Sequence, residues 1–390
     1  MIGAAVLGCG TVGSGVVKML TDNREWIRRA AGQEICLKYV VDIREVDLPE
    51  GVELTGDFDK VLADDEVRVC VETIGGARIA YDYTRRALAS GRTVVTSNKE
   101  LVASHGDELI RLAEANGARY LYEASVGGGV PIVRPMENDL SGNRIRRVMG
   151  IVNGSTNYLL TRMEDTGASF DVALQEAKRL GYVEANPSAD IDGHDARRKL
   201  AILAHTAFGS ALADEALIPT TGISAVTEDD LKLAHAAGAT VKLIARGERT
   251  ADGWNGWVHP ALVPVGHPLY AVRDVFNGIL VNGDFVDDVM FYGRGAGSLA
   301  TASACMGDVI DAARGAKAYA RFGAVAPFDA AAAAGMRAFV RVPEGTAIPE
   351  GCRTVEAEGL RAVLTPALAP EALDELICSL RTDAQPMYVI

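Results

Sequence analysis

Residues 2–20 read IGAAVLGCGTVGSGVVKML, and this stretch decides the fold. An apolar run typical of a buried strand leads into a glycine loop, and helical spacing begins directly after the loop. The glycines fit the pattern G-x-G-x-x-G in the strand–loop–helix setting that the pattern requires. The first allows a tight turn, the second lets backbone approach a pyrophosphate, and the third lets helix and strand pack closely. The stretch therefore favours a dinucleotide-binding loop over a simple turn. Its candidate cofactor residues are Gly8, Gly10, Thr11, Val12 and Gly13.

Strand and helix patterns alternate along the first third of the chain. Predicted strands cover residues 35–43, 67–75, 92–98 and 118–129. This alternation predicts a mostly parallel sheet with helices on both faces, as in a Rossmann domain. From about residue 130 the pattern changes to helices mixed with strands, with strands expected near 256–263 and 279–286. The fold class that follows is α/β, with an N-terminal Rossmann domain and a second α+β domain.

Composition excludes several classes of protein. The chain has 390 residues, of which 48% are apolar, and none of its apolar runs reaches the roughly 18 residues of a membrane span. The N-terminus has no basic segment, so we expect no signal peptide. A net charge of −13 argues against a nucleic-acid surface. The six cysteines are scattered without a C-x-x-C pair, which is typical of reduced thiols in a cytoplasmic protein.

An acid at the end of the second predicted strand can bind the adenosine ribose. Asp42 is the candidate, although it comes later after the glycine loop than is usual. Arg44 follows two residues later and could pair with a 2′-phosphate instead. Asp42 could also be an ordinary surface acid at a strand end. The sequence therefore leaves the choice between NAD and NADP open.

Residues 181–202, GYVEANPSADIDGHDARRKLAI, place several acids before a helix that carries a lysine. Asp192 could cap that helix. Asp195 and Lys199 stand four residues apart, a spacing common in exposed ion pairs of a few tenths of a kcal/mol. The alternative is a functional cluster of carboxylates and an amine, and sequence physics alone does not exclude either interpretation.

Several motifs together resemble those of the homoserine dehydrogenases. Besides GCGTVG and the stretch at 181–202, they are TSNKELVA (96–103), YEASVGGGVPIV (122–133), NGSTNYLLTRM (153–163) and GRGAGSLATASA (293–304). Their order and spacing match over roughly residues 3–315. The resemblance implies a homodimer that interconverts L-homoserine and L-aspartate 4-semialdehyde with NAD or NADP, on the route to threonine, methionine and isoleucine.

The resemblance also assigns roles within the acid–lysine stretch. It implies that Glu184, Asp190 and Asp195 bind the substrate, whose ammonium needs carboxylates. Lys199 is then the amine that accepts the hydroxyl proton, or returns it in the reducing direction. Gly181 falls where the family's backbone approaches the cofactor.

Further candidates lie outside that stretch. Lys99 opens a helix, a poor place for a cation because the helix dipole is positive there, so a functional role is favoured over an ordinary lysine at a helix start. By resemblance, Lys99 lies near the nicotinamide and substrate, as a second candidate for proton transfer or orientation. By resemblance, Gly297 belongs to a loop that closes over the cofactor. The resemblance also implies a structural Na⁺ or K⁺ site, for which a simple interdomain turn is the alternative. Its ligands would be Glu123 and the carbonyls of Val126, Gly128 and Val130.

The resemblance sets the expected domains. They are a Rossmann domain at 1–130, completed by about 295–318, a dimerisation and catalytic domain at 131–294, and a C-terminal region at 319–390. The last resembles a degenerate ACT module that lacks room for its first helix, so inhibition by threonine is doubtful.

The chain departs from the family at Asn186, where Asp is usual, and at Arg197, where a small residue is common. Both flank the candidate catalytic residues, so affinity or substrate scope could differ. Two other functions also remain to be considered. One is a related dehydrogenase of another amino acid or a sugar acid, and the other is a nucleotide-sensing regulator without activity. The partners expected are a small substrate and a second copy of the chain, with no nucleic acid and no membrane.

Overall fold

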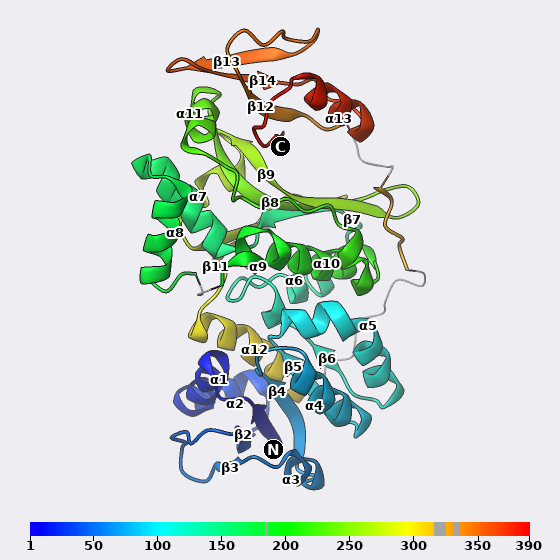
Figure 1. Cartoon of the computed structure of the whole chain (residues 1–390). Helices are drawn as coiled ribbons and strands as arrows, with labels where there is room; N and C mark the ends of the chain where they lie inside the picture. The colour runs from blue at the N-terminus through cyan, green and yellow to red at the C-terminus, as the bar shows by residue number, and fades with distance from the viewer. Residues whose placement is uncertain (184–185, 316–324, 331–334) are drawn as a thin grey trace. The chain divides into compact units, whose positions relative to one another are not determined.

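The computed structural model describes residues 1–183, 186–315, 325–330 and 335–390. They form two compact units (Figure 1). The first comprises Met1–Gly142, Ala201–Glu215 and Gly293–Val325, and the second comprises Asn143–Leu200, Ala216–Tyr292 and Ala326–Ile390. Across the described residues, every helix is too short or too polar to cross a membrane.

The first unit contains a six-stranded sheet in the order β3-β2-β1-β4-β5-β6, and all its strand pairs are parallel. The strands are β1 (Ile2–Leu7), β2 (Ile35–Val41), β3 (Glu53–Thr55), β4 (Val67–Glu72), β5 (Thr93–Thr96) and β6 (Tyr120–Leu121). Leu7 pairs in register with both Val41 and Glu72, so the carboxyl ends of β1, β2 and β4 meet at one edge. Loops that follow these strands therefore lie together, as ligand sites of open α/β sheets do.

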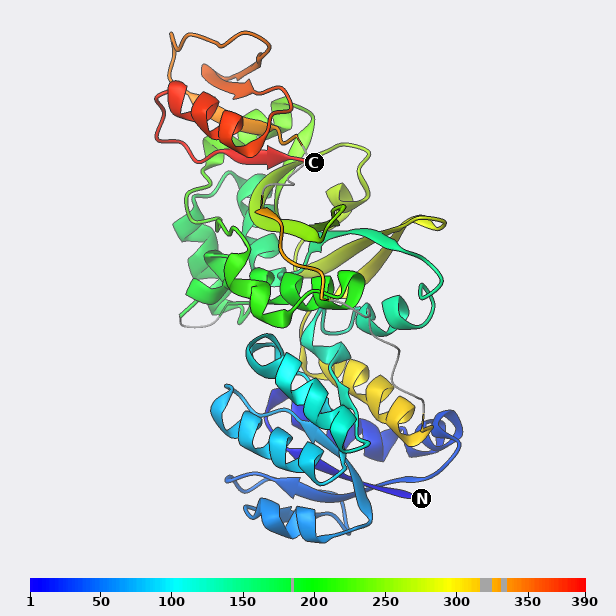
Figure 2. The ribbon, with the colours of Figure 1, turned by 90° about the vertical axis from the view of Figure 1, so that its right-hand side faces the viewer.

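Helices cover both faces of this sheet (Figure 2). Those that contact its strands are α1 (Thr11–Asp22), α2 (Arg24–Ala31), α4 (Arg78–Ala89), α5 (Lys99–Ala115) and α12 (Ser298–Ala313), with the 3₁₀ turn η1 (Glu123–Ser125). The unit also contains the short helices α3 (Phe58–Ala63) and α6 (Val133–Glu137). α12 packs along α1, although it comes nearly 300 residues later in the chain. Gly15 permits this contact, because a Cβ there would lie 2.9 Å from the carbonyl oxygen of Ser298.

The second unit is built on a nine-stranded sheet in the order β11-β10-β7-β8-β9-β15-β12-β14-β13. Its strands are β7 (Ile145–Ile151), β8 (Ala239–Arg249), β9 (Trp254–Pro264), β10 (Phe276–Gly283), β11 (Asp287–Arg294), β12 (Ala338–Val342), β13 (Arg353–Ala357), β14 (Leu360–Leu364) and β15 (Met387–Val389). Its helical elements are α7 (Gly154–Thr166), α8 (Phe170–Arg179), α9 (Ser188–Ile191), α10 (His194–Phe208), α11 (Glu228–Ala236), α13 (Pro370–Ser379), and the 3₁₀ turns η2 (Leu212–Leu217) and η3 (Pro268–Ala271). Two of these elements, α10 and η2, continue into the first unit. α7 packs on β8 and β10.

The C-terminal strands continue this sheet. β15 pairs in parallel with β9, and β12 pairs antiparallel with β15 and β14. Residues 343–352, between β12 and β13, form a turn without a helix, and α13 is the one helix in the described part of the tail. The expected lack of a helix between these two strands is confirmed, whereas the likeness of the tail to an ACT module stays a prediction.

Candidate active site

Backbone conformation and packing explain two of the three glycines in the loop, Gly8 and Gly13, but they do not explain Gly10. Gly8 has φ +89°, in the left-handed region that favours glycine. A Cβ on Gly13 would lie 2.0 Å from the carbonyl oxygen of Gly8, so this position must be glycine for β1 and α1 to pack. At Gly10, by contrast, the nearest atom among the described residues would be Arg44 Nη2 at 3.9 Å. Packing within the protein therefore does not require Gly10.

The first turn of α1 provides donors for an anion. Its N–H groups have no partner within the helix, and Gly10, the N-cap, has no side chain to accept from them. Together with the helix dipole, these groups suit a pyrophosphate. Gly297, the N-cap of α12, has φ +118°, and the next residue, Ser298, donates from Oγ to the carbonyl oxygen of Thr11 at 2.5 Å. The predicted cofactor residues Gly297 and Thr11 are thus held close together.

The side chains of Asp42 and Arg44 form an ion pair beside the glycine loop. Asp42 Oδ2 accepts from the Cys9 N–H at 2.7 Å and from Arg44 Nη2 at 2.8 Å, and Oδ1 accepts from Arg44 Nε at 3.0 Å. The Arg44 guanidinium holds the pKa of the Asp42 carboxyl well below its usual range. The Asp42 side chain is 6% exposed and that of Arg44 is 59% exposed. The group presented to a ligand here is therefore mainly the arginine.

Lys99 is the first residue of α5 and follows β5 at the same sheet edge as the glycine loop. Asn98 caps this helix, since its Oδ1 accepts from the Leu101 N–H at 3.0 Å. Asn98 also donates from Nδ2 to the carbonyl oxygens of Ile74 and Gly76, at 3.1 and 2.8 Å. The backbone that carries Lys99 is therefore tied to the loop after β4.

In the second unit, Lys199 and Asp195 form a buried ion pair. Lys199 Nζ lies 2.7 Å from Asp195 Oδ2 and donates to the carbonyl oxygen of Val152, also at 2.7 Å. The two side chains are 10% and 3% exposed. This burial rules out the exposed surface pair that the four-residue spacing also allowed. A buried pair needs good geometry and further hydrogen bonds to offset desolvation, and such clusters are common at functional sites.

Asn153 joins the acids and was missed as a site residue from the sequence. Its Nδ2 donates to Asp190 Oδ1 at 2.7 Å and to Asp195 Oδ2 at 2.8 Å. Its Oδ1 accepts from the Thr156 N–H at 2.8 Å and so caps α7. The asparagine at the start of NGSTN, just before a helical pattern, is a recognisable N-cap signal. Its bridge between two acids, however, has no signature in the sequence.

Two predicted residues lie near this cluster in the chain. Gly181 has φ +75° and follows α8, and the carbonyl oxygen of the next residue, Tyr182, accepts from Ser155 Oγ at 2.8 Å. The loop is thereby attached to the first turn of α7. Glu184 lies outside the described residues. The structure thus brings together Asp190, Asp195 and Lys199 in the second unit, while the glycine loop, Asp42, Arg44, Lys99 and Gly297 belong to the first.

The segment predicted to hold a monovalent cation is buried. The Glu123 carboxylate accepts backbone N–H bonds from Ile132, Val133 and Arg134 at 2.6, 3.2 and 2.5 Å. Burial raises the pKa of Glu123, and these hydrogen bonds oppose the rise. Within the described part of the chain, the carbonyl oxygens of Val126, Gly128 and Val130 accept no hydrogen bond. Buried carbonyls without donors suit a hard cation with oxygen ligands.

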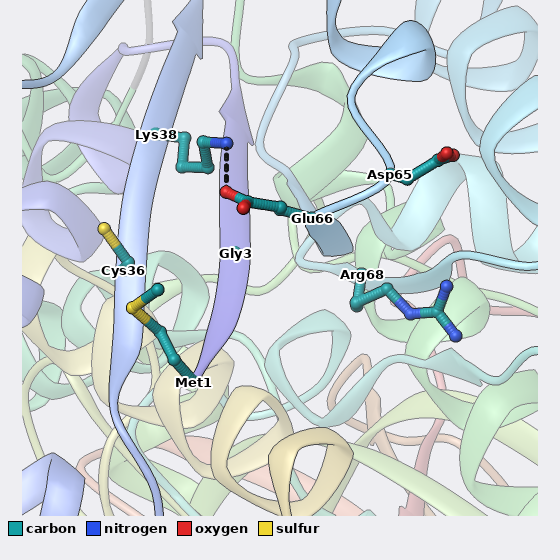
Figure 3. Close-up of a pocket in the computed structure, with 7 residues that line it drawn as sticks. All are labelled: Met1, Gly3, Cys36, Lys38, Asp65, Glu66 and Arg68. Atoms are coloured by element: carbon teal, nitrogen blue, oxygen red, sulfur yellow. Dashed lines mark hydrogen bonds and ion pairs between the residues drawn. The ribbon is translucent and has the colours of Figure 1, made fainter.

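The cavity of about 360 Å³ in Figure 3 includes neither the residues around the glycine loop nor those around Lys199. It lies at the amino ends of β1, β2 and β4, the opposite edge from the glycine loop, and it contains none of the predicted site residues. Lys38 projects toward Glu66 across it, and their ion pair is 2.7 Å long. Ligands of open parallel sheets bind at the carboxyl ends of strands, so we assign this cavity no role in the reaction.

Comparison with known proteins gives one consistent family. A family model described as homoserine dehydrogenase matches residues 131–310, and one described as homoserine dehydrogenase, NAD binding domain, matches residues 8–123. The chain is 42% identical over 314 residues to the homoserine dehydrogenase of Bacillus subtilis, covering 79% of this chain and 72% of that protein. It is 41% identical over 323 residues to that of Corynebacterium glutamicum, with coverage of 80% and 72%.

Solved structures show the same similarity. A homoserine dehydrogenase from Thiobacillus denitrificans superposes with a TM-score of 0.90 at 33% identity, over 100% of this chain and 98% of that one. A hyperthermophilic archaeal homoserine dehydrogenase in complex with NADPH gives a TM-score of 0.68 at 27% identity, over 82% of this chain and 99% of that one.

Proposed function

The chain belongs to the homoserine dehydrogenase family, and from this premise we propose that it interconverts L-homoserine and L-aspartate 4-semialdehyde at the cluster around Lys199. The reaction would serve the synthesis of threonine, methionine and isoleucine. The observation that carries the proposal is the buried lysine–acid pair, extended to a second acid by Asn153. The nicotinamide, when bound, supplies the hydride acceptor for the oxidation and the hydride donor for the reduction.

The residues of the cluster have complementary tasks. Asp190 and Asp195 provide negative charge for the substrate ammonium, and Glu184 is the third candidate. In its neutral amine form Lys199 accepts the proton of the substrate hydroxyl during oxidation, and in its ammonium form it gives that proton to the carbonyl oxygen during reduction. As an ammonium it also stabilises developing charge on that oxygen. Asp195 and the Val152 carbonyl hold the amine in place. Lys99 is a second candidate for orienting the substrate or moving the proton.

Arg44 supports a preference for NADPH over NADH. Four donors already occupy the Asp42 carboxylate, namely the Cys9 N–H and three N–H groups of Arg44, so it has little capacity left for ribose hydroxyls. The exposed guanidinium, in contrast, can bind a 2′-phosphate with two charge-assisted hydrogen bonds.

Arg44→Ala is expected to raise the KM for NADPH roughly 10-fold, the effect of losing one charge-assisted contact. The KM for NADH should change much less, because NADH has no 2′-phosphate. Steady-state kinetics with both cofactors measures the ratio. Arg28→Ala, which removes an exposed arginine of α2, is the matched control. An equal loss with both cofactors would contradict the assignment.

A monovalent cation at Val126, Gly128 and Val130 is supported by their buried carbonyls and by Glu123 alongside. The three N–H bonds to the Glu123 carboxylate leave about one of its four lone-pair directions for a further contact. Binding to the native state alone should raise the unfolding temperature by roughly 2 °C when NaCl or KCl replaces choline chloride at equal ionic strength. Identical unfolding temperatures in all three salts would speak against the site.

The homodimer is supported by the free edge of the larger sheet. β11 is an edge strand, Phe285 in the turn before it is 87% exposed, and Tyr292 within it is 54% exposed. An unprotected edge strand can pair with another chain, and exposed apolar residues beside it mark an interaction surface. Light scattering should give twice the chain mass of 41.2 kDa. A particle of single mass at micromolar concentration would refute the dimer.

The activity itself is tested by following reduced-nicotinamide absorbance with homoserine and either oxidised cofactor, each with and without KCl or NaCl. We expect turnover of homoserine with at least one cofactor. A panel of other amino acids and sugar acids serves as the comparison. Turnover of one of these with no oxidation of homoserine would replace the proposed substrate.

A further inference from the structure

Glu72 is a buried carboxyl group for which the proposed chemistry has no use. It is the last residue of β4, in the middle of the parallel sheet, and it is 0% exposed. Burying a carboxyl group is unfavourable unless hydrogen bonds compensate. Its contacts therefore need an explanation.

These contacts tie the ends of two neighbouring strands together. Glu72 Oε1 accepts from the Ile74 N–H at 2.6 Å, and Oε2 accepts from Thr96 Oγ1 at 2.5 Å. Thr96 Oγ1 in turn accepts from the N–H of Asn98 at 2.9 Å, and Asn98 caps α5. The carboxyl group is thus linked through two hydrogen bonds to the turn that begins at Lys99.

The residue after Glu72 contacts the glycine loop. The Thr73 N–H donates to the carbonyl oxygen of Leu7 at 2.9 Å, and Thr73 Oγ1 donates to that of Gly8 at 2.6 Å. A Cβ on Gly13 would approach Thr73 Oγ1 to 2.7 Å. Three loops at the carboxyl edge of the sheet therefore meet around Glu72 and Thr73.

In its buried surroundings the Glu72 carboxyl group gains or loses its proton near neutral pH. Burial raises the pKa of Glu72 to about 7, and the hydrogen bonds from Thr96, Ile74 and Asn98 only partly oppose this. Two titratable groups interact electrostatically with Glu72, namely the Tyr120 hydroxyl on β6 and the Cys305 thiol on α12. Burial raises the pKa of both, so they stay neutral in this range.

We propose that Glu72 is a positioning residue for the dinucleotide, whose carboxyl group joins the loop after β4 to the first turn of α5. It thereby fixes the position of the glycine loop relative to Lys99. The proposal rests on the proposed function only in that these two segments bind a nicotinamide dinucleotide. Because the pyrophosphate is an anion, ionisation of Glu72 beside its loop weakens binding, and binding takes up a proton.

The test measures the Kd of NADH between pH 6 and pH 8, by nicotinamide fluorescence, for the wild type and for Glu72→Gln and Glu72→Ala. NADH is the probe because it lacks the 2′-phosphate of NADPH, which would itself titrate in this pH range. For the wild type we expect the Kd to rise roughly 3-fold or more from pH 6 to pH 8, the effect of one partly screened charge. Glu72→Gln should bind tightly without this dependence. Glu72→Ala, which loses the hydrogen bonds to the carboxyl group, should bind about 10-fold more weakly at every pH.

A control separates positioning from stability. Val69→Ala removes buried side-chain volume from the same strand, so it should lower the unfolding temperature without changing the pH profile of NADH binding. A pH-independent Kd in the wild type, a retained dependence in Glu72→Gln, or normal binding by Glu72→Ala would each overturn the proposal. If Glu72→Ala fails to fold, the isosteric Gln variant decides. A wild type that binds NADH with the expected pH profile but does not oxidise homoserine would refute the proposed substrate and leave the role of Glu72 intact.

Discussion

Lys199→Ala is expected to lower kcat by roughly 10²-fold or more, the usual effect of losing a proton-transfer group. Lys199 Nζ is held by Asp195 and the Val152 carbonyl, so no other amine can take its position without rearrangement of the cluster. The cofactor should still bind, because the glycine loop belongs to the first unit. Steady-state kinetics gives kcat, and nicotinamide fluorescence gives the cofactor Kd.

Two companions make this result specific. Lys232→Ala removes an exposed lysine of α11 in the same unit and should leave turnover unchanged. Lys199→Met keeps the length of the side chain but not the amine, so it should be as inactive as the alanine variant and more stable. Near-normal turnover by either Lys199 variant would remove this residue from proton transfer and leave Lys99 as the candidate.

Gly10→Ala should weaken cofactor binding by at least about 10-fold while leaving the unfolding temperature nearly unchanged. In the protein itself the new Cβ meets nothing closer than Arg44 Nη2 at 3.9 Å among the described residues, so the expected cost to stability is only that of a poorer N-cap, about 1 kcal/mol, which is small for a chain of this length. The loss must then come from the approach of the pyrophosphate to the backbone, which a methyl group blocks. Cofactor titration and thermal unfolding measure the two quantities.

Two control variants, Gly13→Ala and Gly56→Ala, show what a harmful and a harmless substitution of glycine should do. At Gly13 the Cβ would collide with the Gly8 carbonyl oxygen at 2.0 Å, so both stability and binding should fall. At Gly56 nothing described lies within 4 Å, so neither should change. If Gly10→Ala binds the cofactor as tightly as Gly56→Ala does, the dinucleotide does not use this loop.

The fold of the first unit could be predicted from the sequence because each element has a local signal there. The run before Gly8 and the helical spacing after Gly13 are continuous, and β1, β2 and β4 are mostly apolar. In the second unit, β8 was not predicted although it is a central strand. Its apolar pattern is interrupted by Lys242, which is 0% exposed and donates to Asn157 Oδ1 at 2.9 Å. A buried lysine satisfied by a residue 85 positions away has no local signal.

The candidate site also combines a contact that the local sequence predicts with contacts that it does not predict. The four-residue spacing of Asp195 and Lys199 predicted their contact, since such residues share a helix face. Their burial depends on β7 and the start of α7, which place Val152 and Asn153 against them. Glu72 was not singled out, because an acid at the end of a strand pattern normally reaches solvent. Contacts between residues distant in the chain decide each of these cases, and local patterns do not contain them.

A crystal structure with homoserine and NADPH bound tests the central claim most directly, since this pair cannot react. We expect the homoserine hydroxyl within about 3.2 Å of Lys199 Nζ and its ammonium on the carboxylates of Asp190 and Asp195. Homoserine bound elsewhere, or a Lys199 amine that contacts no atom of it, would contradict the account.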